Sequence, residues 1–195
     1  NGTKRGIIGD TVDMSLCAKA KDEFNMGCKA RTVSFTQLYG GKITAALSRQ
    51  HPRDLFDCKY MDISSFEDVK DGFMLCLLGS DKPIIESLQP NEIDQTDALE
   101  KQFEGMSDIV FSYEDYKQAR LQLVKLVQEG MTKADKDFLL SFEEGCPDWS
   151  LCSAGDLSKY PSVQWKLLNI RNLKEHIIQK HEQGIKKLKD FLFPK

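Results

Sequence analysis

Apolar residues recur at helical spacing through most of this chain, and glycine, proline or capping residues separate the segments. The expected helices cover residues 16–24, 35–49, 52–61, 65–78, 82–88, 98–103, 113–127 and 133–142. A final helical stretch begins at Pro161 and weakens at Gly184. Only Gly6–Ile8 and Arg31–Val33 have β character. The pattern predicts a mainly α fold with a few short strands near the amino terminus.

Capping residues support several of these helix starts. Ser34 is placed to cap the helix that begins at Phe35. Ser65 with Asp68, and Thr132 with Asp135, have the spacing of capping boxes. We therefore expect helices to begin immediately after these serine and threonine residues.

The composition narrows the class of protein. The chain has 195 residues, 41% of them hydrophobic and 29% charged, which is typical of a soluble globular protein. Its longest apolar run, Phe73 to Leu78, is too short to span a bilayer, and no secretory signal opens the chain. A formal net charge of -3 gives no bulk attraction to nucleic acid. We expect a cytoplasmic protein that has no membrane partner.

The cysteines and the basic carboxy-terminal segment suggest no separate site. The six cysteines include no C-x-x-C pair, so reduced thiols are favoured over disulfides or a zinc site. Residues 166–195 are rich in lysine. This segment could contact RNA or an acidic partner, but a solvated helix face is favoured.

The most unusual residues gather between Leu38 and Asp57. On a helix, Lys42, Ala46 and Arg49 share one face, so that two cations point the same way. The glycines at positions 40 and 41 make the helix slim, which permits close approach of another backbone or of a ligand.

The following helix adds carboxylates to this cluster. Asp54 and Asp57 are i, i+3 neighbours, and Arg53 and Asp57 are i, i+4 neighbours. Lysine and arginine can neutralise nucleotide phosphates, while an aspartate orients the lysine or a metal-bound water. The same residues can instead form a structural network that locks the two helices together. Spacing alone leaves both interpretations open.

The run from Leu38 to Asp57 resembles the K…R…R-D-L-F-D signature of AbiEii-type nucleotidyltransferases. The likeness extends to Phe138–Phe142, Pro147–Leu151 and Gln164–Arg171. The resemblance implies an α+β parent, in which a DNA-polymerase-β-like nucleotidyltransferase core precedes a helical region. Residues 1–34 would be a remnant of that core, and residues 35–195 the helical domain that carries the motif. The chain begins with Asn1 rather than Met, so we expect it to be part of a longer protein.

The resemblance also implies a function. Members transfer a nucleotide from an NTP and form the toxin half of bacterial abortive-infection toxin–antitoxin pairs. The implied partners are an NTP with Mg²⁺, an RNA acceptor and an antitoxin that need not contact the toxin directly. By the motif, Lys42, Asp54 and Asp57 are the catalytic candidates. The nucleotide-binding candidates are Lys42, Arg49 and Arg53.

One family motif is missing from this sequence. The family carries G-S-x-x-x-D-x-D on a strand, whose aspartates hold the divalent metals. Gly79–Lys82 begins with Gly-Ser but lacks an aspartate at the required position, and Gly9–Asp13 has the wrong spacing. We therefore expect no metal ligands within this chain, and expect the fragment to be inactive alone while the full-length parent is active.

Two other functions remain open. A non-catalytic helical module that binds protein or RNA would use the same cluster as a structural network. A metal-dependent nuclease built on Asp54 and Asp57 is disfavoured, because no third carboxylate or histidine has suitable spacing.

The histidines and tryptophans have structural interpretations. His51 could hydrogen-bond a nucleotide or act as a base, but a histidine at a hinge more often caps a helix. We expect His176 and His181 to be solvated, and Trp149 and Trp165 to belong to the core.

Overall fold

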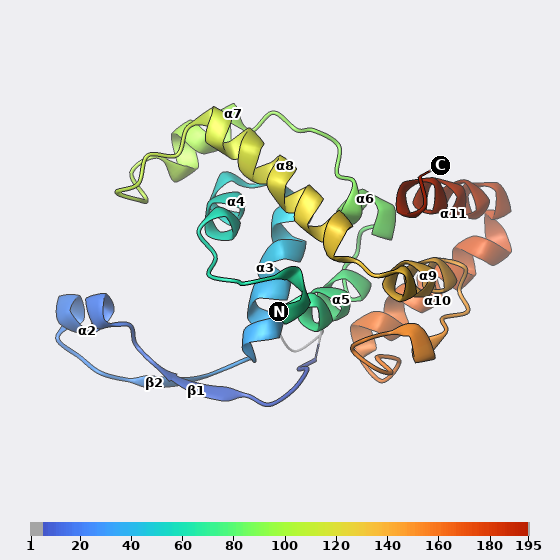
Figure 1. Cartoon of the computed structure of the whole chain (residues 1–195), viewed down its shortest axis with the longest axis horizontal. Coiled ribbons are helices and arrows are strands. Elements are labelled where there is room, and N and C mark those ends of the chain that lie inside the picture. The colour runs from blue at the N-terminus through green and yellow to red at the C-terminus, as the bar shows by residue number, and fades with distance from the viewer. Residues whose placement is uncertain (1–5, 195) are drawn as a thin grey trace.

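The computed structural model describes residues 6–194 and shows a mainly α protein, as the sequence predicted (Figure 1). The strands are β1 (Val12–Ser15) and β2 (Lys29–Thr32). The helices are α2 (Ala18–Phe24), α3 (Phe35–Arg49), α4 (Pro52–Lys59), α5 (Lys70–Leu78), α6 (Ile84–Leu88), α7 (Thr96–Ala98), α8 (Tyr113–Gly130), α9 (Lys133–Glu143), α10 (Pro161–His176) and α11 (Ile178–Leu192). Shorter turns are η1 (Phe66–Asp68), η2 (Leu99–Phe103, a π-helical turn) and η3 (Trp149–Leu151). None of the helices described is long and apolar enough to cross a membrane.

Residues 12–32 form an arm that projects from the helical body (Figure 1). Strands β1 and β2 pair antiparallel, with Val12 opposite Thr32, and α2 lies at the tip of the arm. The strand expected at Gly6–Ile8 was wrong, because this segment has no strand partner. Its backbone is instead bound by the side chain of Gln37 in α3, which accepts from Ile8 N at 2.9 Å and donates to Gly6 O at 2.8 Å.

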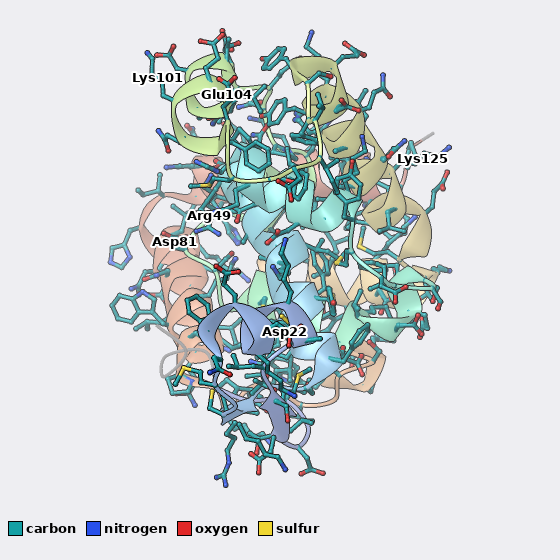
Figure 2. The ribbon with its side chains drawn as sticks, turned by 90° about the vertical axis from the view of Figure 1, so that its left-hand side faces the viewer. Asp22, Arg49, Asp81, Lys101, Glu104 and Lys125 are labelled. Atoms are coloured by element: carbon teal, nitrogen blue, oxygen red, sulfur yellow. The ribbon has the colours of Figure 1, made fainter. Side chains whose placement is uncertain are left out.

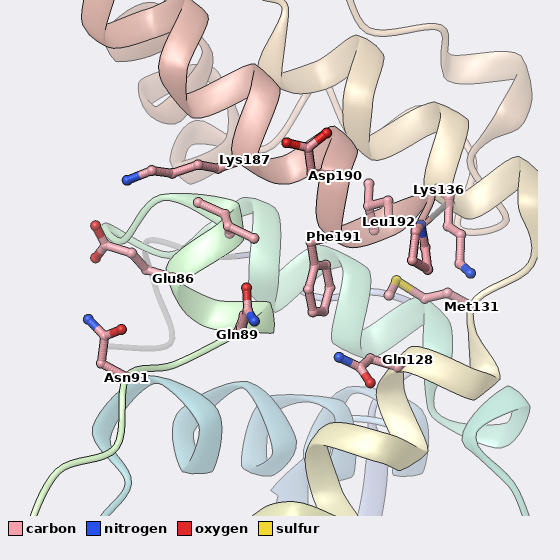
Figure 3. A pocket seen from close by; sticks show the side chains of 12 residues that line it. Glu86, Gln89, Asn91, Gln128, Met131, Lys136, Lys187, Asp190, Phe191 and Leu192 are labelled. Atoms are coloured by element: carbon pink, nitrogen blue, oxygen red, sulfur yellow. The ribbon is translucent and has the colours of Figure 1, made fainter.

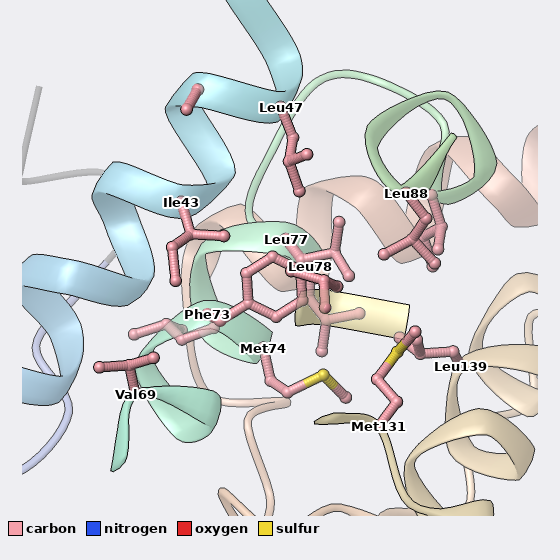
Figure 4. Close-up of a cluster of buried hydrophobic side chains, with 14 of the residues drawn as sticks. Ile43, Leu47, Val69, Phe73, Met74, Leu77, Leu78, Leu88, Met131 and Leu139 are labelled. Carbon is pink, nitrogen blue, oxygen red and sulfur yellow. The ribbon is translucent and has the colours of Figure 1, made fainter. Parts of the chain in front are cut away.

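The centre of the fold is the crossing of α3 and α5 (Figure 4). A Cβ on Gly40 would collide with the backbone of Gly72 and Phe73, and a Cβ on Gly72 would collide with the backbone of Thr36. The two glycines therefore allow the helices to approach within backbone contact, as expected for a slim helix. Side chains from both helices, including Ile43 and Phe73, are buried around this crossing.

The predicted capping boxes at Ser65 and Thr132 are both present. At the second, Asp135 accepts from Thr132 N at 2.9 Å and also lies 3.3 Å from Lys70 Nζ in α5. Both of these charged side chains are buried. The carboxylate of Asp135 thus caps the start of α9 and also joins this helix to α5.

The final helical stretch breaks at Ile177, not at Gly184 as the sequence suggested. Ile177 has φ −136° and ψ 60°, which ends α10 and lets α11 fold back against it, whereas Gly184 lies inside α11. Helix α11 also packs against α6 and α9. Long-range contacts therefore decide the position of this turn.

Two expectations about aromatic side chains near this hairpin were wrong. The side chain of Trp165 is 65% exposed rather than in the core. His181 is buried rather than solvated, with its Nε2 2.9 Å from Glu143 O. By contrast, Trp149 is partly buried and packs on Phe138 and Phe142 at the edge of the core.

Candidate functional site

The predicted site residues meet at a cavity of about 1050 Å³ beside α3. Helix α3 supplies one wall, α4 contributes two aspartates, and the turn between α5 and α6 supplies another wall. The lining residues are Gly6, Ile7, Val33, Gln37, Leu38, Gly41, Lys42, Thr44, Ala45, Ser48, Arg49, Asp54, Asp57, Cys76, Ser80, Asp81, Lys82 and Ile93. Four of the five residues singled out from the motif therefore line one cavity.

Each cation of α3 is held by a carboxylate of α4. Lys42 Nζ lies 2.5 Å from Asp57 Oδ2, and Arg49 Nη2 lies 3.0 Å from Asp54 Oδ1. The Arg49 side chain is 60% exposed and that of Lys42 is 38% exposed, so both cations remain accessible to a ligand. The aspartates restrict their side chains without removing them from solvent.

The face that carries the cations differs in one position from the expectation. Ala46 was expected between Lys42 and Arg49, but it is fully buried against the core. Ala45 and Ser48 line the cavity instead. Because a small side chain still lies between the cations, the cavity floor stays open.

The junction between α3 and α4 is fixed by Gln50, which the sequence did not single out. Gln50 adopts left-handed φ 51°, which ends α3. Its Nε2 donates to Asn91 O at 2.6 Å, and its Oε1 accepts from Arg120 Nε at 2.7 Å. Its carbonyl also accepts from the Tyr116 hydroxyl at 3.0 Å. The angle between the two helices, and thus the pairing of their charges, rests on this buried residue.

Arg53 and Cys58 of α4 do not line the cavity. Arg53 is exposed and is absent from the cavity lining, so the structure separates it from Lys42 and Arg49. Burial, together with the charges of Asp57 and Asp54, raises the pKa of the Cys58 thiol to about 12. This thiol therefore stays protonated at neutral pH and is not a nucleophile.

His51 caps α4 and does not line the cavity. Its Nδ1 accepts from Arg53 N at 3.2 Å, and its Nε2 lies 3.1 Å from Gln102 Oε1. A neutral ring with its proton on Nε2 satisfies both contacts. The geometry favours the capping role over the role of a base.

We expect His51→Ala to lower the free energy of unfolding by about 1 kcal/mol through loss of the cap. His51→Asn, which retains a capping acceptor, should stay close to wild type. Urea denaturation of the three proteins tests this expectation. If His51→Ala weakened nucleotide binding and left stability unchanged, the histidine would belong to the ligand site instead.

The turn from Ser80 to Lys82 is a part of the site that the motif did not predict. Ser80, Asp81 and Lys82 all line the cavity, and Lys82 Nζ donates to Ser48 O in the last turn of α3. Figure 2 shows Arg49 and Asp81 near each other on the side that faces the viewer, above α2 in that view. In the sequence, the Gly79-Ser80 pair is notable only because the residues after it fail to match the metal motif. Its proximity to the cations arises from the packing of α5 on α3.

The structure provides no metal centre in the part of the chain that it describes. No group of three or more histidine, cysteine, aspartate or glutamate side chains in residues 6–194 could hold a metal ion. Asp54 and Asp57 are each engaged by a cation. The donor set therefore does not fit a divalent metal.

A second cavity, of about 870 Å³, lies where α6, α8 and α9 meet α11 (Figure 3). Phe191, Gln89 and Gln128 are among its lining residues, together with Lys187 and Asp190 of α11. It contains none of the motif residues, which all lie in or beside the first cavity.

The family of the chain follows from a comparison with protein-family models. The model described as "Nucleotidyl transferase AbiEii toxin, Type IV TA system" matches residues 3–167. The chain belongs to the AbiEii family. No curated protein and no solved structure matches it.

The match confirms the resemblance inferred from the 38–57 run. AbiEii proteins are described as nucleotidyltransferase toxins of type IV toxin–antitoxin systems. The matched residues include α3, α4 and the Ser80–Lys82 turn, and they end within α10. The cavity beside α3 that Lys42, Arg49, Asp54 and Asp57 line, which we call the motif cavity, thus lies wholly within the AbiEii match. Helix α11 lies beyond the match.

Proposed function

We propose that this chain supplies the triphosphate-binding part of a nucleotidyltransferase, whose full-length form transfers a nucleoside monophosphate from an NTP to an acceptor. In that reaction a hydroxyl of the acceptor, which we take to be RNA, bonds to the α-phosphorus, and the bond to the pyrophosphate breaks. The product acts as the toxic modification in a bacterial abortive-infection pair, and a cognate antitoxin counteracts it in the cytoplasm.

One observation supports this proposal above the others. Lys42 and Arg49 line one cavity of about 1050 Å³, and each is held by its own carboxylate. A cavity of this size is large enough for a nucleotide. Two accessible cations on one face of α3 suit a polyphosphate, because arginine binds two oxygens as a fork and lysine binds as a point charge.

The residues of the cavity have separate roles in this proposal. Lys42 binds the phosphates, and Asp57 orients the lysine. Arg49 binds a second phosphate oxygen, and Asp54 orients the guanidinium group. The ammonium and guanidinium groups each have further N–H donors, so that a phosphate oxygen can bind while the carboxylate keeps its contact. Arg53 takes no part, since it lies outside the cavity.

The metal of the reaction is not held by the residues described. Mg²⁺ neutralises the phosphates and activates the attacking hydroxyl in nucleotidyl transfer. The sequence carries no G-S-x-x-x-D-x-D motif, whose aspartates hold these metals in the family. We therefore assign the metal ligands to the core of the full-length protein, and assign to this chain only the recognition of phosphate.

A growth assay of the full-length gene tests this function. The gene is induced with and without its upstream neighbour, and wild type is compared with Lys42→Ala and Asp57→Ala at matched expression. We expect growth arrest that both substitutions abolish and that the neighbour relieves. Arrest that persists in both variants would refute the catalytic role of Lys42 and Asp57.

The pairing of Lys42 with Asp57 across two helices also favours a second candidate, a non-catalytic helical module that binds protein or RNA. In that case Lys42→Ala would destabilise the fold and leave toxicity unchanged. The two functions thus predict opposite results for Lys42→Ala. A toxin that uses Lys42 loses its effect on growth, whereas a structural network loses stability in a denaturation experiment.

A further inference from the structure

Lys166 is a buried lysine of α10 that binds the Ser80–Lys82 turn, which forms one wall of the motif cavity, although Lys166 itself does not line the cavity. Only 7% of the residue is exposed. Its Nζ donates to Leu77 O at 3.0 Å, to Ser80 Oγ at 3.0 Å and to Lys82 O at 2.7 Å. These contacts use all three hydrogens of the ammonium group.

The acceptors are the end of α5 and the turn that follows it. Leu77 belongs to the last turn of α5, where the exposed carbonyls carry partial negative charge and attract a cation. Ser80 Oγ donates in turn to Leu77 O at 2.8 Å. A single ammonium group therefore holds the helix end and both ends of the Ser80–Lys82 turn.

The turn transmits this restraint to α3. Lys82 Nζ donates to Ser48 O, one residue before Arg49. Asp81, between the two residues held by Lys166, lines the cavity and has no hydrogen bond or ion pair among the described residues. The position of the cavity wall at the Arg49 end thus depends on contacts that start in α10.

Charged groups on the other elements surround the lysine. Glu143 of α9 is buried, and its Oε2 has no hydrogen-bond partner among the described residues. Burial raises the pKa of Glu143, while Lys166 and His181 of α11 oppose that rise. Burial also lowers the pKa of Lys166 to about 8, against the charges of Glu143 and Asp81.

We propose that Lys166 is a positioning residue of the nucleotide site. It fixes the Ser80–Lys82 turn, and through Lys82 it fixes the Arg49 end of α3, so that the cavity keeps the shape that binds phosphate. The proposal rests on the proposed function. It assigns to α10 a role in ligand affinity, although α10 contributes no side chain to the cavity lining.

Hydrogen exchange with Lys166→Met tests the positioning directly. We expect faster exchange of the amides of residues 79–82 and 48–50, with little change in the arm or in α8. Leu188→Ala is the matched control, because it removes a buried side chain of α11, a helix that packs against α6 and α9. It should loosen the carboxy-terminal helices and leave residues 48–50 protected. Unchanged exchange in the turn of Lys166→Met, or an equal rise in both variants, would overturn the proposal.

Nucleotide affinity provides the second readout. We expect Lys166→Met to weaken binding of Mg-ATP by about tenfold, with Leu188→Ala close to wild type. Raising the pH from 7.5 to 9 should weaken binding by wild type several-fold, because neutral Lys166 loses one of its three donors and its charge. In Lys166→Met the affinity should not change over this range.

Two failures are distinguishable. If wild type bound no nucleotide, the nucleotide site and this proposal would both fail. If wild type bound Mg-ATP, and Lys166→Met bound it equally well with the same pH profile, only the positioning role would fail.

Discussion

Replacing Lys42 by alanine is expected to weaken Mg-ATP binding on the order of 100-fold, because a charge-assisted hydrogen bond to a phosphate contributes about 1.5–3 kcal/mol. The melting temperature should change little. The ion pair with Asp57 is more than one third exposed on both sides, and pairs of this kind contribute at most about 1 kcal/mol. Isothermal titration calorimetry and thermal denaturation measure the two effects on the same samples.

Matched variants separate the charge at this position from the general effect of removing a lysine. Lys187→Ala removes an exposed lysine beside the second cavity and should leave Mg-ATP affinity unchanged. Asp57→Asn keeps the shape of the partner but removes its charge, so it should weaken binding less than Lys42→Ala does. Equal loss in Lys42→Ala and Lys187→Ala would mean that the nucleotide senses only the net charge of the protein.

Gly40→Ala is expected to cost on the order of 3 kcal/mol in the free energy of unfolding. The new Cβ would overlap the backbone of Gly72 and Phe73 in α5, which cannot rotate away as a flexible side chain can. The helices must therefore separate, and the apolar side chains packed around their crossing lose contact. Urea denaturation measures the change.

The adjacent Gly41 provides the matched control. A Cβ at this position would meet Cys76 Sγ at 3.5 Å, which is an ordinary van der Waals distance. Gly41→Ala should therefore stabilise the protein by about 0.5–1 kcal/mol, since alanine is the better helix former. Similar effects of the two substitutions, of either sign, would show that α3 and α5 do not cross in backbone contact at Gly40.

The sequence predicted the features that depend on local interactions. Ser65 and Thr132 form their capping boxes because each needs only a carboxylate three residues further on. The paired glycines pointed correctly to close approach of a second backbone. The motif also placed Lys42 and Arg49 on one face and brought Asp54 and Asp57 to them, because the hinge between the helices is only two residues long.

Features that depend on contacts between distant segments were not predictable in the same way. Lys166 lies in a lysine-rich segment that resembled a solvated face, yet it is buried because the end of α5 and the turn after it offer three acceptors. His181 is buried for a related reason, since α11 folds back onto α9. Trp165 is a different case, because the helical period places it opposite the buried Val163 and Ile170, so that its exposure follows from the sequence pattern of α10 itself.

Nucleotide binding in the cavity beside α3 is tested most directly by a nuclear magnetic resonance titration of this chain with each common ribonucleoside triphosphate in the presence of Mg²⁺. We predict that the largest amide shifts fall in residues 41–49, 54–57 and 80–82, and that they disappear in Lys42→Ala. Shifts confined to the cavity around Phe191 and Gln128, or no shifts with any of the nucleotides, would contradict this prediction.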